Sequence, residues 1–193
     1  MKEKIFNFFT GKYANEKAEV WNVIYEEIKY LRPTSLLNIG AGLPDGSQSL
    51  YWLSFINMIF PTLENFTNLE IDKEILQKVD KSNKYLAHFV LGDVRNIDVL
   101  VQDNPFDVIF WSHGPEHIYR SEWKSTFSKI ESVARSLVIL QMPWGSGYDK
   151  DAHSGHLSLS IRKGELENFG YTAYYVGEEN SRWADIFSYK VIQ

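Results

Sequence analysis

Two glycines separated by one residue, Gly40 and Gly42, follow the apolar segment 35–39. Glycine lacks a Cβ atom, so the backbone at such positions can come close to a ligand. If a helix follows, its first N–H groups also present a partial positive charge to a carboxylate or phosphate. This order of apolar segment, Gly-x-Gly and helix is typical of loops that hold nucleotide-like ligands in α/β domains. The alternative is an ordinary turn between a strand and a helix.

Carboxylates stand at the ends of the next apolar segments. Glu70 ends one of them, and a carboxylate at the carboxyl end of a parallel strand can accept hydrogen bonds from both hydroxyls of a ribose. Asp72 is a rival for that role, but its position before a predicted helix is better explained as an N-cap. Asp93 follows Gly92 and is a second binding candidate, with a turn-forming role as the alternative. Asp107 starts its segment instead of ending it, so we expect a structural role.

Two histidines are candidates for acid–base chemistry. His113 follows the apolar segment 106–110, and His153 lies in the polar stretch 149–156. Imidazole titrates near neutral pH and can therefore take a proton from a hydroxyl or amine. We expect His113 and His153 to be the catalytic residues. His156 is a further candidate in the same stretch, and solvated loop histidines are the alternative.

The stretch that begins at His113 also has the His-x-x-Glu-His spelling of a zinc peptidase motif, completed by Glu116 and His117. That motif requires one uninterrupted helix to place both histidines on one face. Gly114 and Pro115 stand where a helix would begin, so His113 is expected to precede it. We therefore expect no metal site, and expect Glu116 and His117 to orient a helix or to fill a local polar network.

The composition excludes several classes of protein. The chain of 193 residues has no cysteine, which rules out disulfides, thiolate catalysis and cysteine-based zinc sites. Its net charge of −5 argues against a nucleic-acid surface. No apolar run approaches the ~20 residues of a membrane span, and the first residues do not form a secretory signal, so a cytoplasmic protein without a membrane partner is expected. The many aromatic residues, Trp111 and Trp144 included, are expected to fill the core.

Strands and helices are predicted to alternate along most of the chain. This order predicts an α/β fold with a doubly wound sheet that ends in two closing strands. We predict an N-terminal helical extension over residues 1–33 and one domain over residues 34–193. The predicted strands cover 35–40, 66–71, 88–91, 107–111, 136–142, 171–176 and 186–191, and the predicted helices cover 14–31, 45–60, 73–79, 121–134 and 163–168.

From Leu36 to its C-terminus, the chain resembles the class I S-adenosylmethionine-dependent methyltransferases. The resemblance rests on six short motifs in the family's order, each weak alone. Two positions depart from the pattern, because Asn38 stands where an acid is usual and Pro44 where a third glycine is common. The motifs are Asn38 to Pro44, Glu70, Gly92-Asp93, Phe106-Asp107, Glu116-His117-Ile118 and Pro143-Trp144-Gly145.

The resemblance implies a Rossmann-like, doubly wound, mostly parallel seven-stranded sheet with a C-terminal antiparallel strand pair, and S-adenosyl-L-methionine as the cofactor. Gly40 and Gly42 would lie along its methionine and ribose portions, and Asn38 would bond the methionine amine. Glu70 would bind the ribose hydroxyls, Asp93 the adenine amino group, and Val94 would pack on the adenine ring. His113 and His153 would lie nearest the acceptor, expected to be a small or sugar-containing molecule methylated on oxygen or nitrogen.

Two other functions stay open from the sequence. A catalytically silent methyltransferase-like domain that binds or scaffolds a partner is favoured by Asn38 and Pro44. An NAD-dependent oxidoreductase is less favoured, because its fingerprint needs a glycine where Asp45 stands. A homo-oligomer is possible.

Overall fold

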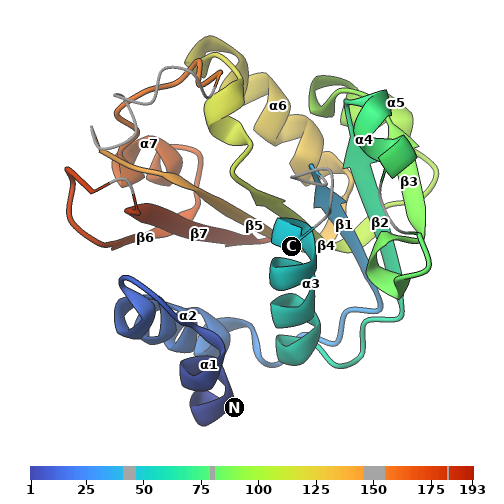
Figure 1. Ribbon diagram of the computed structural model, residues 1–193. Helices are drawn as coiled ribbons and strands as arrows, with labels where there is room; N and C mark the ends of the chain where they lie inside the picture. Colours follow the sequence, from blue (N-terminus) through green and yellow to red (C-terminus); the bar gives the residue numbers. More distant parts are fainter. Residues whose placement is uncertain (41–46, 79–80, 146–154, 182) are drawn as a thin grey trace. The chain divides into compact units, whose positions relative to one another are not determined.

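The computed structural model describes residues 1–40, 47–78, 81–145, 155–181 and 183–193. Its sheet has seven strands in the order β3-β2-β1-β4-β5-β7-β6 (Figure 1). β1 pairs in parallel with β2 and β4, β2 pairs in parallel with β3, and β6 pairs antiparallel with β7. The predicted α/β fold, a mostly parallel sheet with a C-terminal antiparallel pair, is confirmed. The strands are β1 Ser35–Ile39, β2 Asn65–Glu70, β3 His88–Leu91, β4 Phe106–Ser112, β5 Ala134–Pro143, β6 Thr172–Val176 and β7 Asp185–Val191.

The helices of the described residues lie close to the predicted ranges, with two additions. The added helices are α1, Lys2–Phe8, which buries Ile5, and α5, Ile97–Leu100, which buries Ile97. Within the described residues, no helix combines the length and the apolarity needed to cross a bilayer. The other helices are α2 Ala14–Ile28, α3 Ser47–Ile59, α4 Lys73–Lys78, α6 Arg120–Ser132 and α7 Lys163–Glu167, and the short 3₁₀ turns are η1 Lys84–Leu86, η2 Val94–Asn96 and η3 Pro115–His117.

The chain forms two compact units. The first contains Met1–Tyr30, Ser112–Lys124 and Ile139–Lys190, and the second contains Leu31–Trp111, Ser125–Val138 and Val191–Gln193. The strands β4 and β5 each begin in the second unit and end in the first. The division predicted between residues 33 and 34 stays a prediction.

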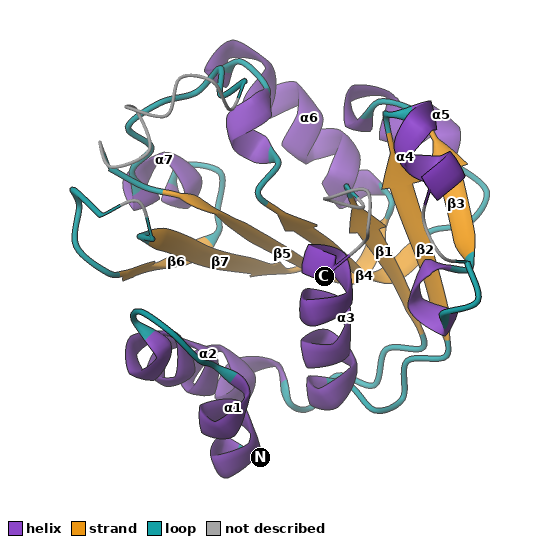
Figure 2. Cartoon of the chain, in the orientation of Figure 1, coloured by secondary structure: helices purple, strands orange, loops and turns teal. Residues whose placement is uncertain are grey.

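In the second unit, the central strands are covered on both faces. The ring of Trp52 on α3 lies 5.8 Å from that of Phe110 on β4, centroid to centroid. The ring of Trp111, the next residue, lies 6.5 Å from that of Phe127 on α6. Because successive side chains of a strand point to opposite faces, α3 and this part of α6 cover opposite faces, as a doubly wound sheet requires (Figure 2).

Asp107 fixes the start of β4 against the start of β1. One of its carboxylate oxygens accepts hydrogen bonds from the Thr34 N–H (2.7 Å), the Thr34 hydroxyl (2.9 Å) and the Ser35 N–H (3.1 Å). Partial burial raises the pKa of Asp107, but these hydrogen bonds outweigh burial and leave the pKa below its ordinary value. The predicted structural role of Asp107 is confirmed.

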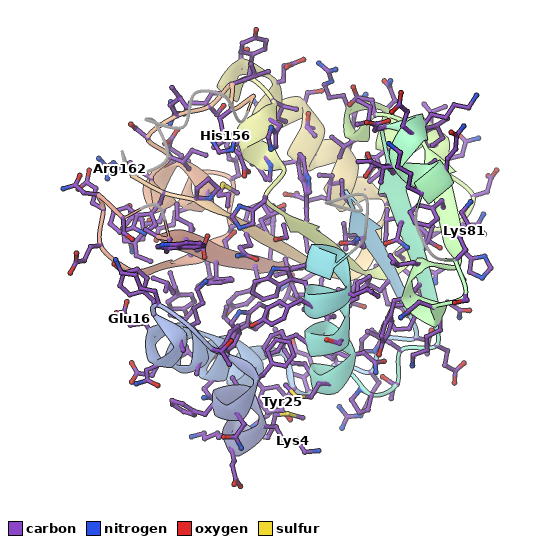
Figure 3. All side chains as sticks on the ribbon, viewed as in Figure 1. Lys4, Glu16, Tyr25, Lys81, His156 and Arg162 are labelled. Atoms are coloured by element: carbon purple, nitrogen blue, oxygen red, sulfur yellow. The ribbon has the colours of Figure 1, made fainter. Side chains whose placement is uncertain are left out.

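In the first unit, α2 packs against the β6–β7 pair. The ring of Trp21 lies 5.8 Å from that of Phe187, and both side chains are fully buried. Lys17 Nζ forms an ion pair with Asp185 Oδ2 at 3.0 Å. Near the start of the same helix, Glu16 (labelled in Figure 3) accepts a hydrogen bond of 2.8 Å from the Gly177 N–H. These contacts fix α2 on the strand that carries Asp185.

Candidate functional site

Backbone hydrogen bonds bring the ends of three parallel strands to one edge of the second unit. The Gly40 N–H donates to the Leu69 carbonyl over 2.8 Å, and the Gly92 N–H donates to the Glu70 carbonyl over 2.9 Å. The ladder therefore continues one residue beyond β1 and β3. The candidate cofactor residues after β1, at the end of β2 and after β3 share one edge, which is where open α/β sheets bind ligands.

Gly40 has the backbone conformation that its predicted role requires. Its φ is +82°, in the region that L side chains rarely adopt, and apart from Gly40 and its two chain neighbours no atom of the described residues lies within 4 Å of a Cβ placed there. A side chain at this position would strain the backbone and occupy the space at the strand end. Gly42, the second glycine of the motif, lies outside the described residues.

Glu70 and Asp72 have different partners. Glu70 is the last residue of β2 and is only 5% exposed, and its Oε1 accepts a hydrogen bond of 2.9 Å from the Asp72 N–H. Asp72 Oδ1 accepts from the Glu74 N–H over 2.7 Å, in the first turn of α4. Asp72 is therefore the N-cap, as predicted, and Glu70 is the carboxylate held at the strand end.

Asn38 belongs to a buried chain of side-chain amides. Its Nδ2 donates to the Gly40 carbonyl (3.1 Å) and to Asn68 Oδ1 (2.9 Å). Asn68 Nδ2 in turn donates to the carbonyls of Tyr85 (2.8 Å) and His88 (3.3 Å). The amide group of Asn38 thus tethers the turn after β1 to β2. The sequence predicts only a hydrogen bond from Asn38 to the methionine amine, and not this structural role.

Asp93 has a cationic neighbour of its own. Arg95 Nε lies 3.0 Å from each Asp93 carboxylate oxygen, and the Arg95 N–H donates to Oδ1 over 2.9 Å. The hydrogen bond from the Arg95 side chain is the main reason why the pKa of Asp93 is lowered. Val94, the next residue, is 8% exposed and lies in the short turn η2 that Asp93 caps.

In the first unit, His113 directly follows β4 in a strained conformation. Its φ of 49° lies in the left-handed region, which is uncommon for a residue with a side chain. The conformation is held by a hydrogen bond of 2.8 Å from the His113 N–H to the Gln141 carbonyl. A strained backbone conformation persists only where the surrounding structure maintains it, and such conformations cluster at functional sites.

The His113 ring lies between two buried carboxylates. Its Nδ1 is 3.4 Å from Glu116 Oε1, and its Nε2 is 3.6 Å from Asp185 Oδ1. Burial lowers the pKa of His113, but the interactions with Glu116 and Asp185 raise it more, so the pKa is above its ordinary value although Lys17 opposes this. Glu116 and Asp185 therefore stabilise the imidazolium that His113 forms when it takes a proton.

A polar strand residue completes this environment. Gln141 on β5 is 1% exposed, its Oε1 accepts a hydrogen bond of 2.9 Å from the Ser112 hydroxyl, and its Nε2 lies 3.4 Å from His113 Nε2. The structure also brings His117 and His156 to Glu116. His153, the other predicted catalytic residue, lies outside the described residues.

Trp111 and Trp144 are core residues, as predicted. Trp111 is 3% exposed. Trp144 is 9% exposed, its Nε1 donates to the Val176 carbonyl over 3.0 Å, and its ring stacks on Tyr175 with centroids 4.1 Å apart. Both indole rings therefore pack against other residues of the protein.

No protein-family model matches the chain, and no curated protein matches it in sequence. Solved structures do match. The N-methyltransferase NodS from Bradyrhizobium japonicum WM9 superposes with a TM-score of 0.62 at 8% identity, over 92% of this chain and 96% of NodS. The magnesium protoporphyrin IX methyltransferase ChlM from Synechocystis PCC 6803, solved with bound SAH, has a TM-score of 0.57 at 9% identity, over 95% of this chain and 89% of ChlM. The chain has the class I methyltransferase fold.

A third solved structure of this fold is the plantazolicin methyltransferase BpumL. It has a TM-score of 0.62 and 12% identity, over 88% of this chain and 80% of BpumL. The methyltransferase fold thus extends across nearly the whole chain. At sequence identities this low, the likeness establishes the fold alone.

Four polar residues around the candidate sites were not identified from the sequence. The sequence marks each of them only weakly, by a polar residue within an apolar run or by a position near a predicted binding residue. Gln141 interrupts the apolar run of β5, Asp185 stands between Ala184 and Ile186, and Asn68 and Arg95 flank predicted binding residues. The four residues are Asn68, Arg95, Gln141 and Asp185.

Proposed function

We propose that the chain is an S-adenosylmethionine-dependent methyltransferase that methylates oxygen or nitrogen of a small or sugar-containing acceptor. The observation that carries this proposal is the shared edge formed by Gly40, Glu70 and Gly92 at the carboxyl ends of β1, β2 and β3. The seven-stranded order of the class I methyltransferase fold supports it.

The described residues of this edge fit the cofactor. Glu70 would accept hydrogen bonds from the ribose hydroxyls, and Gly40, with its positive φ and open Cβ position, would let the backbone lie along the methionine portion. Asp93 would accept from the adenine amino group, and Val94 would pack on the ring. Asn38 would position Gly40 through the hydrogen bond to its carbonyl. Gly42 is proposed for the same loop on the sequence pattern alone.

When bound, S-adenosylmethionine would supply a methyl group already activated on a sulfonium. The protein then has to align the acceptor and, for a hydroxyl or ammonium acceptor, to accept a proton. We propose His113 for the acceptor side, because two buried carboxylates hold its ring and stabilise its charged form. His153 is proposed for the same side from the sequence.

The acceptor class is a proposal from size and charge. The matching structures include proteins named as an N-methyltransferase, a magnesium protoporphyrin IX methyltransferase and a small RNA methyltransferase, so the fold does not select among acceptors. The net charge of −5 favours a small molecule over a polyanion such as RNA.

Titration with S-adenosylhomocysteine, S-adenosylmethionine and NAD tests the proposal. We expect saturable heat with both sulfur ligands and none with NAD. Absence of heat and of thermal stabilisation with either sulfur ligand at millimolar concentration contradicts it. Binding without methyl transfer to any acceptor in a screen of small hydroxyl and amine compounds would favour the silent binding domain instead.

A further inference from the structure

Glu116 is a buried carboxylate without a hydrogen-bond donor in the described part of the chain. Its relative exposure is 0%, and neither Oε1 nor Oε2 has a hydrogen-bond partner there. Burying a carboxylate without such partners is strongly unfavourable, and buried charges in proteins are paired or coordinate metal ions. The nearby charge pair with His113 at 3.4 Å occupies only one of the two oxygens.

Two further imidazoles converge on this carboxylate. His156 Nε2 lies 3.9 Å from Glu116 Oε1, and one ligand atom from each of Glu116, His117 and His156 lies within 4.8 Å of the other two. The rings of His117 and His156 meet edge to face, with centroids 4.9 Å apart. The three residues thus offer one oxygen and two nitrogens around a common point.

The backbone holds the two segments of this cluster together. The Glu116 carbonyl accepts hydrogen bonds from the N–H groups of Leu157 (2.8 Å) and Ser158 (3.0 Å). The Ser158 hydroxyl donates to the Ile118 carbonyl over 2.7 Å. His156 (labelled in Figure 3) is therefore positioned by the scaffold and is only 8% exposed through its side chain.

We propose that Glu116, His117 and His156 form a binding site for a divalent transition-metal ion. Two imidazoles and one carboxylate suit Zn²⁺, Mn²⁺, Fe²⁺ or Co²⁺, whereas Ca²⁺ and Mg²⁺ prefer oxygen ligands alone. Ligands about 2.0 Å from a tetrahedral Zn²⁺ lie roughly 3.3 Å apart, so binding needs the longest separation here to contract. Small side-chain rotations of the exposed His117 can supply that movement.

A second contact of His117 matches this role. Its Nδ1 lies 3.3 Å from the Gly155 carbonyl. Histidines that bind metals almost always donate the other ring N–H to a carbonyl or carboxylate, which fixes the tautomer. A proton on Nδ1 toward Gly155 leaves Nε2 of His117 for the ion. A small solvent-open hollow borders His156.

The site differs from the zinc peptidase motif that the sequence spells. Gly114 and Pro115 do prevent a continuous helix, since only the 3₁₀ turn η3 follows them. His113 therefore is not the second imidazole ligand, and its ring lies beside Glu116 as a positioning partner. His156, distant in the sequence, supplies the second imidazole. The expectation of no metal site considered only the local motif.

Titration of the tag-free, cofactor-free protein with Co²⁺ and Zn²⁺ tests this inference independently of methyl transfer. We expect one equivalent of Co²⁺ to give visible d–d absorption that one equivalent of Zn²⁺ removes. Zn²⁺ at about 100 times its Kd should raise the Tm by roughly 5–10 °C. In Glu116→Gln and His156→Ala, both effects should be lost, while His88→Ala, at an exposed histidine of β3, should retain them.

Circular dichroism of each variant establishes whether it is folded. If His156→Ala fails to fold, metal binding by the isosteric Glu116→Gln variant is the test. The inference is overturned if the wild-type protein gives no Co²⁺ spectrum and no Zn²⁺-dependent stabilisation. It is equally overturned if folded Glu116→Gln binds both ions as tightly as the wild-type protein.

Discussion

The side chain of Asn38 donates a hydrogen bond of 2.9 Å to that of Asn68, and this buried contact joins β1 to β2 just before the candidate cofactor turn. The same Asn38 amide group holds the Gly40 carbonyl. An asparagine at this position is therefore part of a structural chain of amides. It differs chemically from the acid that the family pattern leads one to expect, because an acid would have no proton to donate.

Replacing Asn38 with Asp should destabilise the protein. The new carboxylate would face two acceptors, the Gly40 carbonyl and Asn68 Oδ1, and rotation of the Asn68 amide would break its bonds to Tyr85 and His88. We expect the free energy of unfolding to fall by about 1–3 kcal/mol, measured by urea denaturation. Asn65→Asp, at an exposed position of β2, is the control. Equal or greater stability of Asn38→Asp would show that the amide chain has no such role.

The stabilising effect of Asp107 should depend on pH. Its folded-state pKa is lowered, so its contribution to stability is present above the unfolded-state pKa of about 4 and is lost as pH falls through the folded-state pKa. The difference in unfolding free energy between wild type and Asp107→Asn should therefore be largest near pH 6 and shrink toward pH 3. Thermal denaturation across this range measures it, with Asp103→Asn, at an exposed position, as the control. A difference that stays constant with pH contradicts the assignment.

Removing the imidazole of His113 should reduce turnover and leave cofactor affinity nearly unchanged. We choose His113→Asn because asparagine tolerates the positive φ of this position. If His113 takes a proton from the acceptor, turnover should fall about 10²–10⁴-fold. Affinity for S-adenosylhomocysteine should change less than about twofold, since His113 is proposed for the acceptor side. His88→Ala serves as the control, and full turnover of His113→Asn would make this histidine a bystander.

The strand positions could be predicted because apolar runs and turn residues are local signals, whereas the mostly parallel strand directions came from the family resemblance. Strands β1 to β7 all appeared within about two residues of their predicted bounds. Helices α1 and α5 were not predicted. Helix α1 buries only Ile5 and α5 has four residues that bury only Ile97, so neither shows a helical periodicity. Asp72 as an N-cap and Asp107 as a structural acid followed from position along the chain, which is again local information.

The side-chain environment of the candidate site could not be predicted in the same way. His113, Gln141 and Asp185 lie on separate segments, and only their pairing in the folded unit brings them together. The association of His156 with Glu116 likewise depends on backbone bonds between distant segments. Sequence spacing indicates which residues follow strand ends, whereas partners contributed by another segment appear only in three dimensions.

The central claim, that the edge after β1, β2 and β3 binds S-adenosylmethionine through Glu70, is tested most directly by calorimetric titration of wild type and Glu70→Ala with S-adenosylhomocysteine. Charge-assisted hydrogen bonds to the two ribose hydroxyls are worth about 1.5–3 kcal/mol. The account predicts that the wild-type protein binds and that Glu70→Ala binds about 10- to 150-fold more weakly. Glu64→Ala, at an exposed residue before β2, should bind like the wild-type protein. Unchanged affinity in folded Glu70→Ala, or no binding to the wild-type protein, would contradict the claim.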